Sequence, residues 1–211
     1  MSDAFIREVD EDLRQKQLTD LWNKYGKFVI GIAIGIVIIV AGRGIYNYIV
    51  ESKYNEQADA YAQAILENGA DATTALNQII ASHVDGYEIL ATFKKAELAL
   101  AAEDKLGAVK ILDEFIATAT VPTLYKDIAN VQAAILEVDS ASVDDVRGRL
   151  SLVLNGETNF KYIAAEIVAL AELKAGDVDA AKARLEELLA GEEVPGSVKN
   201  RAEQYLSVIE E

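Results

Sequence analysis

The chain of 211 residues contains no cysteine, only two prolines and a single histidine. The absence of cysteine excludes disulfide bonds and thiolate chemistry. It does not fix the compartment, because a protein in an oxidising space can simply avoid thiols. The lone histidine, His83, has no cysteine partners with which to form a zinc site, and its turn-like surroundings (ASHVDG) favour a capping or solvated role. Few prolines and abundant Ala, Leu, Ile, Glu and Asp favour helix.

Catalytic signatures are also missing. The sequence contains no G-x-S-x-G, P-loop, dinucleotide-binding or kinase motif. Residues 176–179 (GDVD) match the start of a calcium loop, but they lack the third ligand, the glycine and the terminal Glu at the required spacing. A helix start capped by Asp177 or Asp179 explains them better. We therefore expect no enzyme activity, no cofactor, no metal and no small-molecule substrate.

The formal charge of −15 is unevenly distributed along the chain. Residues 1–50 hold six basic and six acidic side chains, which leaves 14 of the 20 basic and 29 of the 35 acidic side chains to residues 51–211. The larger segment therefore carries the whole negative charge. Such a surface repels nucleic-acid phosphates and anionic lipid head groups, so we expect no nucleic-acid partner.

A long apolar run lies near the N-terminus, where residues 28–50 read FVIGIAIGIVIIVAGRGIYNYIV with one charge. As a helix it would be about 34 Å long, and a membrane hydrocarbon core is about 30 Å thick. A buried core helix is one alternative, but residues 28–42 have no polar side chain, so every face is apolar. A cleaved signal peptide is another, but the preceding residues 1–27 are long and of mixed charge. The run predicts an uncleaved transmembrane helix surrounded by lipid.

Aromatic side chains bracket this run, as they do where membrane helices meet water. Trp22 and Tyr25 precede it, and Tyr46 and Tyr48 lie at its distal end. Arg43 lies near the same end, where its long side chain can reach the head groups. These five residues are the predicted interfacial anchors.

Within the run, Gly31 and Gly35 form a small-xxx-small pair (GIAIG), which permits close approach of a second helix in lipid. Glycine is common in membrane helices, so contact with lipid alone is the alternative.

The basic residues on the two sides of the run predict its orientation. Four lie shortly before it and two lie at or beyond its distal end: Arg14, Lys16, Lys24 and Lys27, against Arg43 and Lys53. Segments rich in Lys and Arg beside a membrane helix remain in the cytoplasm. We therefore expect residues 1–27 in the cytoplasm and residues 51–211 on the other side of the membrane, which is the periplasm if the cell is bacterial. The leader has apolar residues at helical spacing and is expected to lie on the membrane, dock on a partner or remain solvated.

An internal repeat organises the rest of the chain. Residues 178–191 (VDAAKARLEELLAG) align without a gap to residues 143–156 (VDDVRGRLSLVLNG), with matching Arg, Leu and Gly positions. The pattern extends to four copies, and each copy is centred on a leucine. An apolar pair lies three and four positions after the leucine. A small or β-branched residue lies four positions before it, and an alanine lies sixteen positions before it. The predicted core positions are Ala60, Leu76 and Ile80; Ala96, Ala108, Leu112 and Ile116; Ala134, Leu150 and Leu154; and Ala169, Ala181, Leu185 and Leu189.

The copies are 35 to 38 residues apart, close to the 34 of a tetratricopeptide repeat. We therefore predict an all-α fold in which about four helical hairpins stack into an α-solenoid over residues 51–211. The alanine on each first helix lets the second helix approach closely, and the apolar pair fills the space between hairpins. Residues 195–210 predict one further helix that caps the stack.

An N-terminal anchor followed by about four tetratricopeptide-like hairpins resembles the YfgM-like family of ancillary subunits of the SecYEG translocon. The leader is similar to that of the alphaproteobacterial branch, in which an LW-x-x-YG-like motif ends the cytoplasmic stretch; here it spans residues 21–26. The resemblance implies a single-pass inner-membrane protein that associates with SecYEG and passes emerging client polypeptides to periplasmic chaperones. It implies no catalytic residues. The alternative is a scaffold or assembly factor for another envelope complex, such as one of cell division or respiration.

Overall fold

The computed structural model describes residue 32 and residues 35–67, 69–84 and 86–209. By its internal contacts the chain divides into two compact units, Met1–Glu56 and Gln57–Glu211. Every regular element in the described residues is a helix, which confirms the all-α prediction for this part of the chain.

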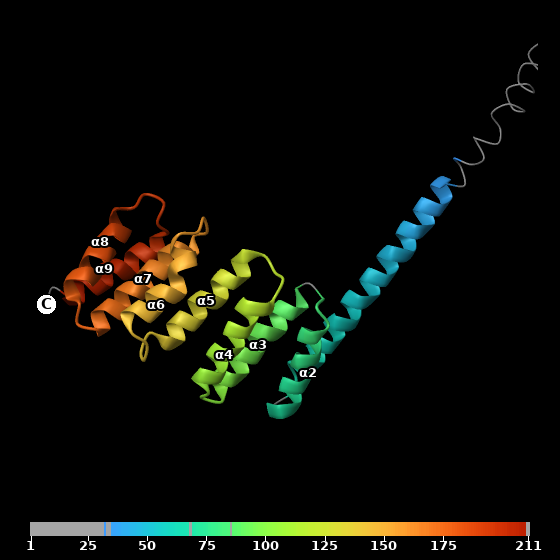
Figure 1. The fold of residues 1–211 in the computed structure, drawn as a ribbon, viewed down its shortest axis with the longest axis horizontal. Helices are drawn as coiled ribbons and strands as arrows, with labels where there is room; N and C mark the ends of the chain where they lie inside the picture. The colour runs from blue at the N-terminus through green and yellow to red at the C-terminus, as the bar shows by residue number, and fades with distance from the viewer. Residues whose placement is uncertain (1–31, 33–34, 68, 85, 210–211) are drawn as a thin grey trace, which may run out of the picture. The chain divides into compact units, whose positions relative to one another are not determined.

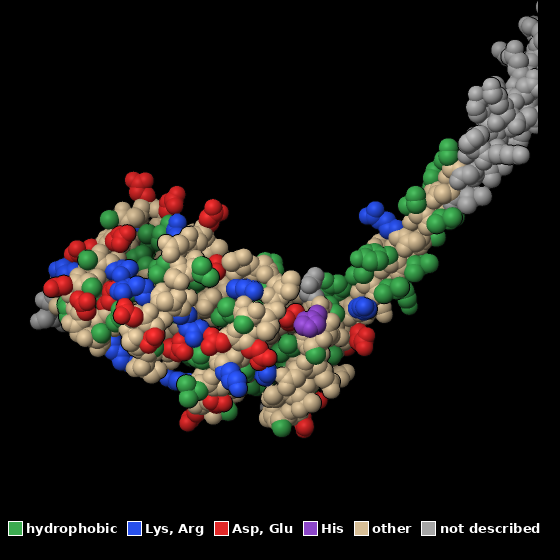
Figure 2. Space-filling view, viewed as in Figure 1, with side chains coloured by type: hydrophobic (Ala, Val, Ile, Leu, Met, Phe, Trp, Pro, Cys, Tyr) green, Lys and Arg blue, Asp and Glu red, His purple; other side chains and the backbone are tan. Residues whose placement is uncertain are grey.

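In the first unit, residues 35–56 are helical, and the helix runs on to residue 64. Over residues 36–40 its apolar side chains are exposed on all sides, from Ile36 at 57% to Ile39 at 70%. Figure 2 shows hydrophobic side chains over the visible face of this helix. A helix long and apolar enough to span a membrane is not found among the described residues. The leader 1–27, Trp22, Tyr25 and Gly31 lie outside them.

The second unit consists of helices in antiparallel pairs. The first pair is formed by residues 57–64 and α2, and three further pairs and a final helix follow (Figure 1). The bounds are α2 Gly69–Ala81, α3 Tyr87–Ala101, α4 Lys105–Thr118, α5 Thr123–Glu137, α6 Val143–Leu154, α7 Phe160–Lys174, α8 Val178–Ala190 and α9 Gly196–Ile209. Each helix packs on the next in sequence, and α9 also contacts α7, so it covers the end of the stack.

Short polar residues define where the second helices begin. Asp104 accepts a hydrogen bond from the Gly107 amide at 2.8 Å, and Ser142 caps α6 in a reciprocal capping box. The carboxylate of Asp177 accepts a hydrogen bond from the Ala180 amide at 3.2 Å, so Asp177 is the cap of α8. These side chains satisfy backbone amides that the first turn of each helix leaves without partners.

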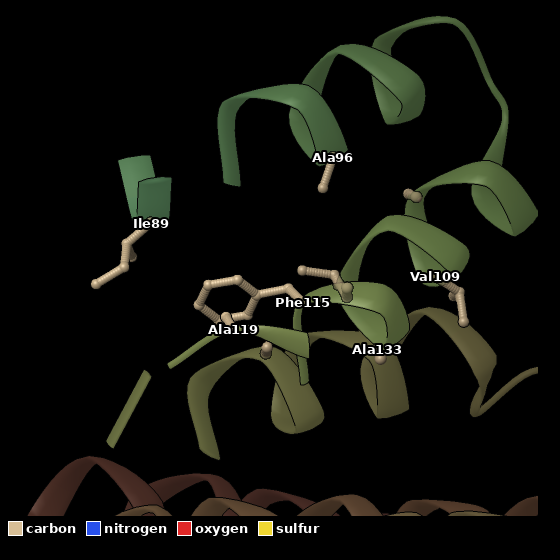
Figure 3. Packing of buried hydrophobic residues seen from close by; sticks show 9 residues of the cluster. Ile89, Ala96, Val109, Phe115, Ala119 and Ala133 are labelled. Carbon is tan, nitrogen blue, oxygen red and sulfur yellow. The ribbon is translucent and has the colours of Figure 1, made fainter. Parts of the chain in front are cut away.

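The hydrophobic core is divided into four clusters, one between each pair of neighbouring hairpins and one beneath the final helix. The repeat leucines Leu76, Leu112, Leu150 and Leu185 are all buried, as are Ala96, Ala108, Ala134, Ala169 and Ala181. Figure 3 shows the cluster between α3, α4 and α5, which includes Phe115 of α4 and Ala133 of α5. Apolar burial between successive hairpins therefore holds the stack together.

The two residues of the apolar pair after each leucine are buried to different extents. The residue three positions on is buried in every copy: Ile79, Phe115, Val153 and Leu188. The residue four positions on is only partly buried: Ile80, Ile116, Leu154 and Leu189. Ala60 in the first hairpin is also partly buried. Positions three and four after the leucine lie about 100° apart around the helix, so only one of them faces the interior fully.

Leu150 and Leu152 on α6 provide a matched pair for testing this core. Leu150 is fully buried, whereas Leu152 is 80% exposed. We expect Leu150→Ala to lower the free energy of unfolding by about 2–5 kcal/mol, because it leaves a cavity. Leu152→Ala should change it by less than about 0.5 kcal/mol. Urea denaturation followed by circular dichroism measures both, and equal losses in the two variants would contradict the stacked core.

Candidate protein-binding surface

Ion pairs connect the two helices of the third and fourth hairpins at equivalent positions. Arg149 Nε lies 2.6 Å from Glu137 Oε2, and Arg184 Nη2 lies 2.8 Å from Glu172 Oε1. In both hairpins the glutamate follows the repeat alanine by three positions, and the arginine precedes the repeat leucine by one. The ion pair is therefore a repeated feature of the second half of the stack.

The same residues also connect one hairpin to the next. Arg149 Nη1 lies 2.6 Å from Asp113 Oδ1 of the preceding hairpin, and Arg147 Nη2 lies 3.0 Å from Glu172 Oε1. Arg149 thus contacts carboxylates from two hairpins, and Glu172 accepts from both Arg147 and Arg184. Such networks fix the relative positions of neighbouring hairpins more firmly than isolated surface pairs do.

Two further contacts extend this arrangement. Lys174 donates to both the backbone carbonyl and the carboxylate of Asp139. Arg201 of α9 makes a bidentate pair with Glu166 of α7, with both N–O distances at 2.6 Å. The parallel fork geometry of this pair is the strong form of an arginine–carboxylate contact. It fastens the final helix to the last hairpin.

The Glu172 carboxylate is almost completely buried, with a side chain 1% exposed. Burial alone would raise its pKa, but the hydrogen bonds and charges of Arg184 and Arg147 outweigh burial and hold the pKa below the ordinary value of 4.5. The hydrogen bond from Arg184 to Glu172 likewise raises the pKa of Arg184. Glu172 is thus ionised at neutral pH inside the stack.

The second hairpin has apolar residues where the later hairpins have these ion pairs. Ala99 and Ile111 occupy the positions of the glutamate and arginine, and both pack against the core. The packing of the first helices also differs along the stack. Helix α5 packs on α7 and α7 on α9, whereas α3 packs on its sequence neighbours α2 and α4. Helices α3 and α5 are therefore not packed on each other as the later first helices are.

An apolar groove of about 480 Å³ lies at this place. Its walls come from the first helices of three successive hairpins, and Leu112 of α4 lies beneath them. The wall residues are Tyr61; Leu90, Phe93, Lys94, Ala96, Glu97 and Leu100 of α3; and Gln132, Ile135 and Leu136 of α5. Its size is within the range of about 300–1,000 Å³ that is usual for ligand pockets.

The groove contains few polar groups. Lys94 and Glu97 pair with each other at 2.8 Å, so their charges offset one another. Leu90 is 48% exposed and Ile135 is 51% exposed, one on each wall. Beneath this surface, the ring of Phe93 meets Phe115 edge-on at 5.8 Å between centroids, which connects the groove to the core. The groove can therefore bind apolar side chains but offers little for polar recognition.

His83 lies at a different pocket, of about 380 Å³, among residues of α2, α3 and α4. Its side chain is largely exposed, and Nδ1 lies 3.4 Å from Glu88 Oε2. Its backbone adopts a positive φ of 49° in the turn before α3. No group of three or more His, Asp or Glu side chains that could hold a metal occurs among the described residues.

The predicted membrane-side residues that the structure describes lie in the first unit. Tyr46 and Tyr48 are exposed, as is Arg43 on the same helix. A side chain added at Gly35 would meet no atom within 4 Å, so no other part of the described chain packs there. The groove residues Leu90 and Ile135 were not identified from the sequence, because a helix pattern does not distinguish a core position from an uncovered one.

A comparison with protein-family models matches residues 19–153 to the tetratricopeptide repeat-like domain. The chain belongs to this family, which confirms the tetratricopeptide-like repeat inferred from residue spacing. The architecture is that of a protein-interaction module, because stacked helical repeats present extended binding surfaces. The match begins before the apolar run and therefore includes it.

Comparison with curated proteins and with solved structures gives no significant match.

Glu172→Gln tests the buried ion-pair network, because glutamine keeps the shape and removes the charge. Near neutral pH we expect a loss of about 1–3 kcal/mol in the free energy of unfolding, since both arginines lose a charge-assisted hydrogen bond. A carboxylate with a lowered folded pKa contributes stability above its unfolded pKa and loses it as pH falls through the folded value. The difference between wild type and variant should therefore shrink at pH well below 4.5.

Urea denaturation across this pH range measures the effect. Glu186→Gln, at an exposed position on α8, is the control and should change stability by less than about 0.5 kcal/mol. A difference between wild type and Glu172→Gln that stays constant with pH would show that the charge of Glu172 is not involved.

Proposed function

We propose that the protein is a membrane-anchored protein-binding module, ancillary to the Sec translocon. In this proposal residues 28–50 cross the bacterial inner membrane once. Residues 1–27 lie in the cytoplasm, and residues 51–211 form a periplasmic domain that receives secreted proteins and assists their hand-over to periplasmic chaperones.

The observation that carries the proposal is the helix of the first unit. Its consecutive apolar side chains, including Ile36, Val37, Ile38 and Ile39, are exposed on every face. Such an exposed apolar surface is unfavourable in water. In lipid it is favourable, and no protein partner is needed to cover each face. The bracketing aromatic residues and the basic flank support the same arrangement.

The repeat domain supports the binding role. It belongs to a family of tetratricopeptide repeat-like domains, and its apolar groove is open to a partner. The association with SecYEG and periplasmic chaperones is supported by the resemblance of the anchor, the leader motif and the repeats to the YfgM-like family. A scaffold for a cell-division or respiratory complex would share the anchor and the repeats but contact different membrane proteins.

The absence of cysteine makes a direct test of topology possible. Single cysteines introduced as Ser2→Cys and Leu152→Cys should react differently with a maleimide that does not cross membranes. In spheroplasts we expect labelling at position 152, which is exposed on α6, and protection at position 2 until the membrane is permeabilised. Labelling at position 2 with protection at position 152 would reverse the proposed orientation.

The partner is tested by crosslinking in intact membranes. A photoreactive residue placed at Tyr48 or at exposed Leu152 should recover SecY, SecE or SecG, and the second position should also recover periplasmic chaperones. Recovery of a cell-division or respiratory complex without any translocon subunit would replace this proposal with the scaffold alternative.

A further inference from the structure

We propose that the groove between α3 and α5 binds a short apolar run in an incompletely folded polypeptide, and that it favours runs flanked by basic residues. This inference rests on the protein-binding role proposed above, but it does not depend on which membrane complex the protein joins.

The groove lies at the step between α3 and α5, where the first helices do not pack on each other. The later first helices bury their facing sides against one another, as α5 does on α7 and α7 does on α9. At the α3–α5 step the corresponding apolar side chains instead remain accessible, and Leu90 and Ile135 are about half exposed. An apolar surface of this size without a covering element is a site for a partner.

The chemistry of the walls decides what kind of partner fits. Aliphatic and aromatic side chains dominate, and the two charged residues on the wall, Lys94 and Glu97, already pair with each other. A ligand rich in hydrogen-bonding groups would leave those groups unpaired on burial, at a cost of about 1–3 kcal/mol each. An apolar run has no such cost. Such runs are accessible in polypeptides before they fold, because a folded protein buries them.

Charge sets the preference for the flanks. Residues 51–211 carry the whole charge of −15, while the groove itself is close to neutral. A basic flank extending beyond the groove meets this acidic surface, whereas an acidic flank is repelled by it. The preference is long-range, so it should weaken as salt screens the charges.

The test uses the full chain in lipid nanodiscs and two fluorescent peptides with the same apolar run. One peptide has lysines on both sides of the run, and the other has glutamates. Fluorescence anisotropy should show the lysine-flanked peptide binding about tenfold or more tightly at low salt, with the difference shrinking as salt is added. Equal affinities at low salt would remove the charge preference.

Ile135→Asp tests the groove, because it places a charge in the apolar wall. We expect it to weaken binding of the lysine-flanked peptide about tenfold or more. Leu152→Asp is the matched control, since it makes the same change of charge on an exposed leucine outside the groove, and it should leave affinity unchanged. Unchanged binding by Ile135→Asp, or an equal loss in both variants, would overturn the proposal.

Circular dichroism melting confirms that each variant is folded. Leu90→Asn on the opposite wall is a milder second variant, and it should also weaken binding if the groove is the site.

The crosslinking experiment above separates the two proposals. Groove-dependent peptide binding without translocon crosslinks would leave this inference standing and remove the translocon role. Translocon crosslinks without peptide binding would do the reverse.

Discussion

The structure depends on the burial of apolar side chains between successive hairpins. A single hairpin in this chain has an apolar surface on each side and cannot cover either one alone. Leu150, Phe115 and their equivalents are buried together in clusters that join one hairpin to the next. The final helix α9 stops the series by covering the last apolar surface with one that faces solvent on its other side.

Ion pairs add to this stacking in the second half of the repeat domain. They are placed at the edges of the hairpins, where Arg149 and Glu172 each connect three segments of chain. Partial burial makes these contacts less sensitive to salt than surface pairs, and each charged group has a partner of opposite sign. In the second hairpin Ala99 and Ile111 pack on the core at the same positions, and in the first hairpin these positions hold Gln63 and Ala75. The two halves therefore differ in the contacts inside their hairpins, and Arg149 extends the ion pairs back to Asp113 of the second hairpin.

Much of the fold is predictable from the spacing of a few residue types. The repeated alanines and leucines give the helical hairpins because a 3.6-residue period and a regular repeat length leave few other arrangements. The Asp177 cap is predictable for the same local reason. The partner of Glu172 is not, because a charged residue at an amphipathic helix edge has the same pattern whether it faces water or an arginine of another hairpin.

The groove illustrates the other limit of pattern reasoning. Leu90 and Ile135 have the spacing of core residues, and only the distance between α3 and α5 leaves them uncovered. Helix α4 packs on both α3 and α5, whereas α3 and α5 do not pack on each other as α5 and α7 do. Such cumulative effects of packing are not encoded in any single segment.

The unequal joining of the two halves has a consequence for the order in which the domain forms during synthesis. The chain emerges from its N-terminus, so the hairpins that rely on apolar contacts appear first and the ion-paired hairpins appear last. Helices α3 and α4 have no covering surface on their outer side until α5 emerges, and the groove does not exist before that moment. Because Arg201 lies on α9, its contact with Glu166 of α7 forms only after the four hairpins have emerged. This pair therefore joins α9 to a hairpin that is already in place.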